Sequence, residues 1–104
     1  MKRFLRVTFS NGTVYDIPTE FIAKARAEYY AESDAKKGEN FIEVYNEELE
    51  IGLEDDYEIT DWAFNNMDWI DVENVAIFVA VEKENIDRKS EWCNVEHEII
   101  EKDE

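Results

Sequence analysis

The sequence predicts an α+β fold: an N-terminal β-hairpin, two or three helices, and a returning strand that completes a small antiparallel sheet. Three observations predict it. Two strand-like runs flank Asn11-Gly12, long stretches after them have apolar residues at helical spacing, and a run rich in Val and Ile follows. The 104 residues suffice for one small domain, so we expect a single domain over 1–104.

The hairpin is predicted by the runs RFLRVTF (3–9) and VYDI (14–17) on either side of Asn11-Gly12. An Asn-Gly pair between alternating apolar residues is a strong hairpin signal, because both residues tolerate a positive φ. Pro18 should end the second strand, since it has no N–H to donate to a ladder. Thr19 is the predicted N-cap of the helix that follows.

Two helices should come next, over about 20–33 and 39–53, joined by the polar residues 34–40. In the first, Phe21, Ile22, Ala25 and Tyr29 fall at helical spacing. The stretch 39–53 also has a helical stripe, but its end alternates polar and apolar residues from Glu48 to Ile51. We favour a helix there, and a strand at its end stays an alternative.

A further helix is predicted over 54–71, with Asp55 or Asp56 as its N-cap. Its inward stripe contains Ile59, Trp62, Ala63, Asn66 and Ile70. Within DWAFNNMDWID (61–71), Trp69 lies nearly two turns after Trp62. Both indoles are therefore expected to anchor the helix in the core.

The remaining chain should return to the sheet. The apolar run NVAIFVAVE (74–82) predicts a central strand covered on at least one face. Residues 84–91 are expected to form a loop, and 94–100 to add a short edge strand before a frayed, acidic end.

The most informative quantity is the net charge of −16. Residues 1–38 contain seven Lys or Arg and five Asp or Glu, whereas 39–104 contain four and 22, a balance of −18. Such a surface repels free nucleic acid and anionic membranes and attracts basic protein surfaces or cations. No segment is apolar enough to span a bilayer, and no signal peptide is recognisable, so we expect a cytoplasmic protein.

No catalytic or cofactor motif is found, so we predict no enzyme activity and no cofactor. Cys93 and His97 are better explained as a semi-buried Cys and a surface His than as a catalytic pair. Asp61, Asn65 and Asp68 could share a helical face, but they lack the spacing of a calcium loop. We therefore predict no metal site, and a small metal-dependent enzyme stays the third alternative.

Acids on the predicted helix over 54–71 are the candidate partner-binding residues. Carboxylates along a rigid element can imitate phosphates, and nearby aromatic residues supply contact area. A solvated helix face is the alternative explanation. The candidate ridge consists of Glu54, Asp55, Asp56, Glu58, Asp61, Asp68 and Asp71.

The segments VTFSNGTVYDIPTEFIAKARAEYYA (7–31) and EDDYEITDWAFNNMDWIDV (54–72), with the late Trp92, resemble a group of small acidic proteins encoded by tailed bacteriophages. The resemblance implies expression in the cytoplasm of an infected bacterium. It carries no activity or site residues. By analogy with the class, it implies a non-enzymatic protein for host takeover that binds a basic host or phage protein, as a DNA mimic or inhibitor. The alternative is a structural or assembly module, or a homo-oligomer, whose acidity serves solubility.

Overall fold

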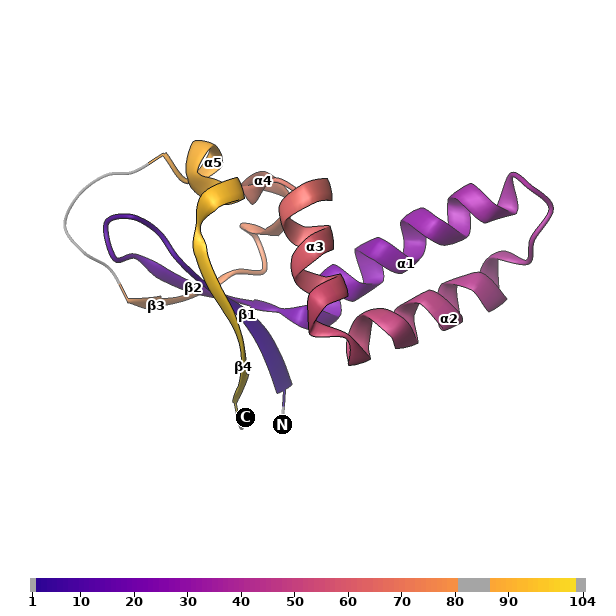
Figure 1. Cartoon of the computed structure of the whole chain (residues 1–104), viewed down its shortest axis with the longest axis horizontal. Coiled ribbons are helices and arrows are strands. Elements are labelled where there is room, and N and C mark those ends of the chain that lie inside the picture. Colours follow the sequence, from indigo (N-terminus) through magenta and orange to yellow (C-terminus); the bar gives the residue numbers. More distant parts are fainter. Residues whose placement is uncertain (1, 81–86, 103–104) are drawn as a thin grey trace.

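A computed structural model describes residues 2–80 and 87–102. Its strands form one antiparallel sheet in the order β3-β2-β1-β4 (Figure 1). β1 spans Lys2–Thr8, β2 Val14–Pro18, β3 Ile77–Ala80 and β4 Glu96–Lys102. In the register of the sheet, Leu5 of β1 lies opposite Ile17 of β2 and Ile99 of β4. The predicted α+β class, with its N-terminal hairpin and returning strand, is confirmed.

The β1–β2 turn forms where the sequence predicted it. Gly12 has a φ of 87°, a left-handed conformation that glycine tolerates, and its N–H donates to the Phe9 carbonyl at 2.9 Å. Pro18 ends β2, as expected. Thr19 is not the N-cap of the next helix but its first residue, and its Oγ1 donates instead to the Arg3 carbonyl at 3.3 Å. Thr19 thus ties the start of this helix to β1.

Helices α1 (Thr19–Ala35) and α2 (Phe41–Glu54) form an antiparallel hairpin that projects from the sheet (Figure 1). The Asn40 side chain caps α2 by accepting a hydrogen bond from the Glu43 N–H at 3.1 Å. The helix over 39–53 is confirmed, and the strand at its end is wrong. The two helices approach closely at Gly52, where an added Cβ would lie 3.1 Å from the Ala23 Cβ.

A buried arginine joins three helices. Arg26 of α1 is only 6% exposed, and its Nη1 donates to Glu48 Oε2 of α2 at 2.9 Å. Its Nη2 donates to Glu58 Oε2 at 3.2 Å, on α3 (Asp56–Asn66). A buried guanidinium is tolerated only when it is paired, so this contact fixes how α2 and α3 sit on α1.

The core lies between one face of the sheet and the helices. Leu5, Val7 and Ile17 supply the sheet side. Trp62 of α3 and Trp69 of the short helix α4 (Trp69–Val72) are each 8% exposed. Both indoles are core anchors, as predicted from DWAFNNMDWID.

The single helix predicted over 54–71 is wrong, because the chain leaves the helical conformation at Met67. Trp92 is fully buried, and its Nε1 donates to the carbonyls of Ala63 and Met67, each at 3.0 Å. The indole N–H satisfies these two carbonyls near the end of α3 and thereby stabilises the break in the helix. Ile70 therefore lies in α4 and is 57% exposed, and Asn66 is exposed as well, so neither belongs to an inward stripe. The Asp55 cap of α3 is confirmed.

The central strand predicted over 74–82 is also wrong. In the described part of this run, β3 covers 77–80, pairs with β2 alone and lies at the edge of the sheet, and all four of its residues are exposed. Positions 81 and 82 lie outside the described residues. β1 and β2 take the two interior places, because β4 pairs with the other side of β1 and β3 with the other side of β2. A continuous apolar run gives no periodicity from which strand order could be read.

Near the C-terminus, the predicted loop contains a short helix. Asp87 caps α5 (Arg88–Glu91), which leads into the 3-10 turn Trp92–Asn94 and then β4. The edge strand expected around 94–100 is confirmed as β4. Positions 84–86 of the predicted loop and the last two residues, 103 and 104, lie outside the described chain.

Candidate functional site

One face of α2 is lined by carboxylates. Successive spacings of four, three and four residues bring its members onto a single side of the helix. All of them are exposed. We call this surface the α2 acidic face, and it consists of Glu43, Glu47, Glu50 and Glu54.

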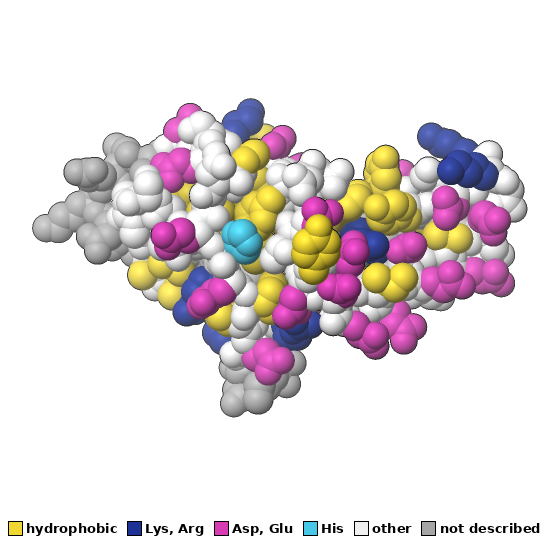
Figure 2. Space-filling view, in the orientation of Figure 1, with side chains coloured by type: hydrophobic (Ala, Val, Ile, Leu, Met, Phe, Trp, Pro, Cys, Tyr) yellow, Lys and Arg dark blue, Asp and Glu magenta, His cyan; other side chains and the backbone are white. Residues whose placement is uncertain are grey.

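The charge of this face is not balanced locally. Helix α2 contains five Glu and no Lys or Arg, and the fifth, Glu48, turns inward to Arg26. Within residues 2–80 and 87–102, the four carboxylates of the α2 acidic face have no ion-pair partner. Figure 2 shows Asp and Glu side chains gathered along this side of the helical hairpin. The face is therefore a concentrated negative surface on a rigid element.

Exposed apolar side chains accompany these acids. Ile42 is 69% exposed near the start of α2, and Ile51 and Leu53 are 44% and 38% exposed near its end. Aliphatic side chains in such positions gain free energy when a partner covers them. The surface thus combines charge with contact area.

The acidic face ends in a shallow hollow at the α2–α3 corner. The hollow has a volume of about 480 Å³ and is lined by Ile51, Glu54, Asp55, Asp56 and Tyr57. Tyr57 is 69% exposed. Asp55 is occupied by capping α3, and Asp56 forms an ion pair with Arg3, which leaves Glu54 as the carboxylate here that extends the α2 acidic face.

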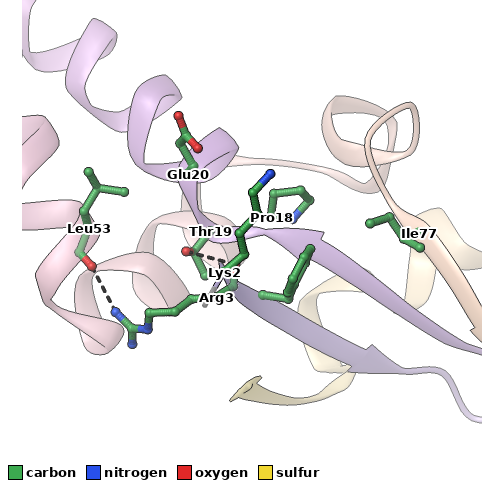
Figure 3. A pocket seen from close by; sticks show the side chains of 8 residues that line it. Lys2, Arg3, Pro18, Thr19, Glu20, Leu53 and Ile77 are labelled. Atoms are coloured by element: carbon green, nitrogen blue, oxygen red, sulfur yellow. Dashed lines mark hydrogen bonds between the residues drawn. The ribbon is translucent and has the colours of Figure 1, made fainter. Parts of the chain in front are cut away.

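Arg3 fixes this corner to the sheet. Its Nη1 donates to the Leu53 carbonyl at 2.9 Å, across a neighbouring hollow of about 410 Å³ (Figure 3). Phe4, Pro18 and Ile77 line the apolar side of that hollow. Because Arg3 binds both Leu53 and Asp56, we assign its positive charge a role in stabilising the fold.

The other acids predicted for a ridge are dispersed. Glu58 faces Arg26. The Asp61 carboxylate accepts a hydrogen bond from Asn65 Nδ2 at 2.9 Å. Asp68 and Asp71 lie beyond the far end of α3, where the Asp68 N–H donates to Asp71 Oδ2 at 2.8 Å. The 11 residues of α3 span about 16 Å. The structure thus brings Glu54, Asp55 and Asp56 together and places Asp68 and Asp71 elsewhere.

Three members of the α2 acidic face, Glu43, Glu47 and Glu50, were missed by the sequence reasoning. The signal was present, because 43, 47, 50 and 54 follow the i, i+4, i+7, i+11 pattern of one helical face. It applies only if 39–53 is helical, which the sequence left open.

Cys93 lies in the 3-10 turn Trp92–Asn94, and His97 lies in β4. Cys93 is exposed, which corrects the semi-buried position predicted for it. The exposed His97 packs its ring against Phe64 with centroids 4.5 Å apart, and its Nδ1 lies 3.2 Å from the Val95 carbonyl. No group of three or more His, Cys, Asp or Glu in the described chain could hold a metal ion.

Comparison with known proteins adds no family: no protein-family model, curated protein or solved structure matches the chain. Across the residues that the structure describes, no helix is long and apolar enough to cross a membrane.

Proposed function

We propose that this chain is a non-enzymatic, phage-encoded protein that acts in the host cytoplasm by binding a basic surface of a host or phage protein. The observation that carries the proposal is the α2 acidic face, four exposed carboxylates on one helix without a basic neighbour in that helix. Complementary charge steers such partners together and selects among them. The exposed aliphatic side chains beside the face supply contact area.

The spacing of these acids supports DNA mimicry of a limited kind. Glu54 lies eleven positions after Glu43 in the helix, which corresponds to a rise of about 16 Å. Over that length one DNA strand carries about five phosphates and the duplex about ten. Four carboxylates therefore approach the charge of one strand. A partner that grips a single phosphate backbone, or a basic protein groove of similar charge, fits this face best.

The proposal is tested by capturing partners from a bacterial lysate at about 50 mM and about 500 mM salt, where screening differs strongly. Two variants with four Glu→Gln changes each are compared with the wild type, and Gln keeps the helix propensity of Glu. The α2 amide variant changes Glu43, Glu47, Glu50 and Glu54. The control amide variant changes the exposed Glu73, Glu96, Glu98 and Glu101.

Basic proteins should be retained by the wild type and by the control amide variant at low salt only. The α2 amide variant should lose them, although its net charge equals that of the control. Retention of the same proteins by all three chains, or binding that ignores salt, would contradict the proposal.

A second candidate function, a homo-oligomeric assembly module, is supported by β3. Ile77, Phe78 and Val79 are 45%, 55% and 41% exposed on an uncharged edge strand. Exposed apolar edges are templates for strand pairing between chains. Light scattering tests this function: a stable oligomer that persists at high salt and is lost in Phe78→Lys supports it, and a monomer at all concentrations removes it.

A further inference from the structure

A hollow between α1 and the α3–α4 corner has a composition different from that of the α2 acidic face. Its volume is about 370 Å³. Most of its walls are apolar or aromatic, and one carboxylate lies at its border. The lining includes Phe21 and Tyr29 of α1, Trp62 and Asn66 of α3, and Met67 and Asp71 beyond it.

The aromatic walls are held in place before any ligand binds. The rings of Tyr29 and Trp62 lie 5.2 Å apart between centroids at 55°, and Tyr30 packs against both, at 5.5 Å from Tyr29 and 5.6 Å from Trp62. Tyr29 is nevertheless 57% exposed. A large ring that is ordered by its neighbours yet open to solvent can bind a ligand at a low cost in side-chain entropy.

The charge at the border is oriented as well. Asp71 is exposed, and its Oδ2 accepts a hydrogen bond from the Asp68 N–H at 2.8 Å, which restricts the carboxylate to one orientation. No Lys or Arg is among the residues that line the hollow. Arg26 Cζ lies 4.9 Å from the centroid of the Tyr30 ring, but Arg26 does not line the hollow and its charge is paired by two carboxylates. A cationic ligand would therefore meet a carboxylate and aromatic rings in a lining that contains no cation of its own.

We infer that this hollow receives a cationic side chain, an arginine in preference to a lysine, from a basic protein. Aromatic rings attract a cation through their negative faces, and a nearby carboxylate adds a charge-assisted hydrogen bond. The planar guanidinium suits both contacts, since it stacks on a ring and presents N–H groups at its edge. A purely apolar ligand fits less well, because it would desolvate Asp71 without pairing it.

This inference rests on the proposed function in one respect, the basic character of the partner. The hollow adds a second contact, which distinguishes cations by their shape as well as by their charge. The α2 acidic face attracts any positive surface, whereas an aromatic hollow with one carboxylate discriminates arginine from a charge-matched lysine.

The test uses a small probe, so that it does not depend on identifying a partner. N-acetyl-arginine methylamide is titrated into the protein and followed by ¹H–¹⁵N NMR, with the neutral citrulline analogue as the matched control ligand. The indole N–H of Trp62 is a useful reporter, because Trp62 Nε1 has no hydrogen-bond partner in the described part of the chain. We expect saturable shifts of the Trp62 indole and of the Asn66 amide with the arginine probe alone.

Two variants with matched controls locate the site. Tyr29→Ala should weaken the affinity for the arginine probe at least about fivefold, as expected for loss of a cation–π contact. The control Tyr57→Ala should leave this affinity unchanged. Asp71→Asn keeps an oxygen that can accept from the Asp68 N–H but loses the charge, so it should also weaken the affinity for the probe. The control Asp68→Asn should leave this affinity unchanged.

Equal shifts with citrulline, or unchanged binding to Tyr29→Ala, would overturn the inference. Either result would leave the proposed function standing if the α2 amide variant still loses its basic partners. Conversely, probe binding in the hollow of a protein that retains no basic partner would count against the proposed function alone.

Discussion

Asp16 of β2 provides a sharp test of how the sheet is stabilised. Its carboxylate is fully buried on the face of the sheet that the helices do not cover, opposite Leu5 and Ile17. Arg6 donates to it through Nε at 2.8 Å and Nη2 at 2.9 Å, and Lys102 Nζ of β4 lies 2.6 Å from Oδ2. One carboxylate thus joins β1, β2 and β4.

Asp16→Asn removes this charge while nearly keeping the shape of the side chain. Breaking a buried ion pair costs about 3–5 kcal/mol when the remaining charge stays buried. The Arg6 and Lys102 side chains are 32% and 36% exposed and can partly hydrate, so we expect the lower end, about 3 kcal/mol. That is a large part of the roughly 5–15 kcal/mol typical of a domain, and the variant should still fold.

The loss should depend on pH. Burial by itself would raise the pKa of Asp16, but hydrogen bonds from Arg6 and Lys102, with the attraction of both cations, outweigh it and lower this pKa. A carboxyl with a lowered folded-state pKa stabilises the protein above its unfolded pKa of about 3.9, and that contribution disappears as the pH falls through the folded value. The difference between wild type and variant should be constant from about pH 5 to 7 and shrink below about pH 4.

Urea unfolding followed by tryptophan fluorescence measures both effects. Glu98→Gln is the matched control, because it removes one negative charge from an exposed residue opposite Arg6 in the sheet and should change the unfolding free energy by less than about 1 kcal/mol. The reasoning is refuted if Asp16→Asn is as stable as the control at pH 7, or if its deficit is the same at pH 3 and pH 7.

Other side chains give further predictions, each measured by urea unfolding. Arg26→Met should lower the free energy of unfolding by about 2–3 kcal/mol, since Glu48 and Glu58 then face each other unpaired. The control Lys24→Met, at an exposed position, should lower it by less than about 1 kcal/mol. Equal losses would contradict the role of Arg26 at the three-helix contact. Ile70→Ser should change stability by less than about 0.5 kcal/mol and the buried Val72→Ala by about 2 kcal/mol, and the reverse order would contradict the break at Met67. Trp92→Phe should cost at least about 2 kcal/mol by leaving two carbonyls at the end of α3 without their donor, and a neutral result would show that the indole does not stabilise that break.

Local patterns predicted much of this fold. The Asn-Gly turn, Pro18 at the end of β2 and the Asp55 cap depend on a few neighbouring residues, and all were correct. Two of the wrong predictions, the single helix over 54–71 and the central strand over 74–82, depend on contacts distant in sequence. The break at Met67 is stabilised by Trp92, 25 residues away, and the place of β3 at the sheet edge depends on which strand pairs with β1.

The candidate site follows the same division. The sequence predicted Asp55 and Asp71 as partner-binding residues, but the carboxylate of each already accepts a local backbone hydrogen bond. The α2 acidic face was encoded by simple helical spacing and was hidden by the ambiguity of 39–53. Arg26 was overlooked because nothing in its own neighbourhood shows that Glu48 and Glu58 converge on it.

We propose that the placement of charge on α2, rather than the total charge of the protein, drives binding. The salt dependence of the affinity for a captured basic partner tests this proposal. We predict that the wild type and the control amide variant share one slope of log Kd against log salt, since the control acids lie outside the contact. The α2 amide variant should bind at least about tenfold more weakly, with a shallower slope. If both variants weaken equally, net charge alone governs binding, and the α2 acidic face is not the binding surface.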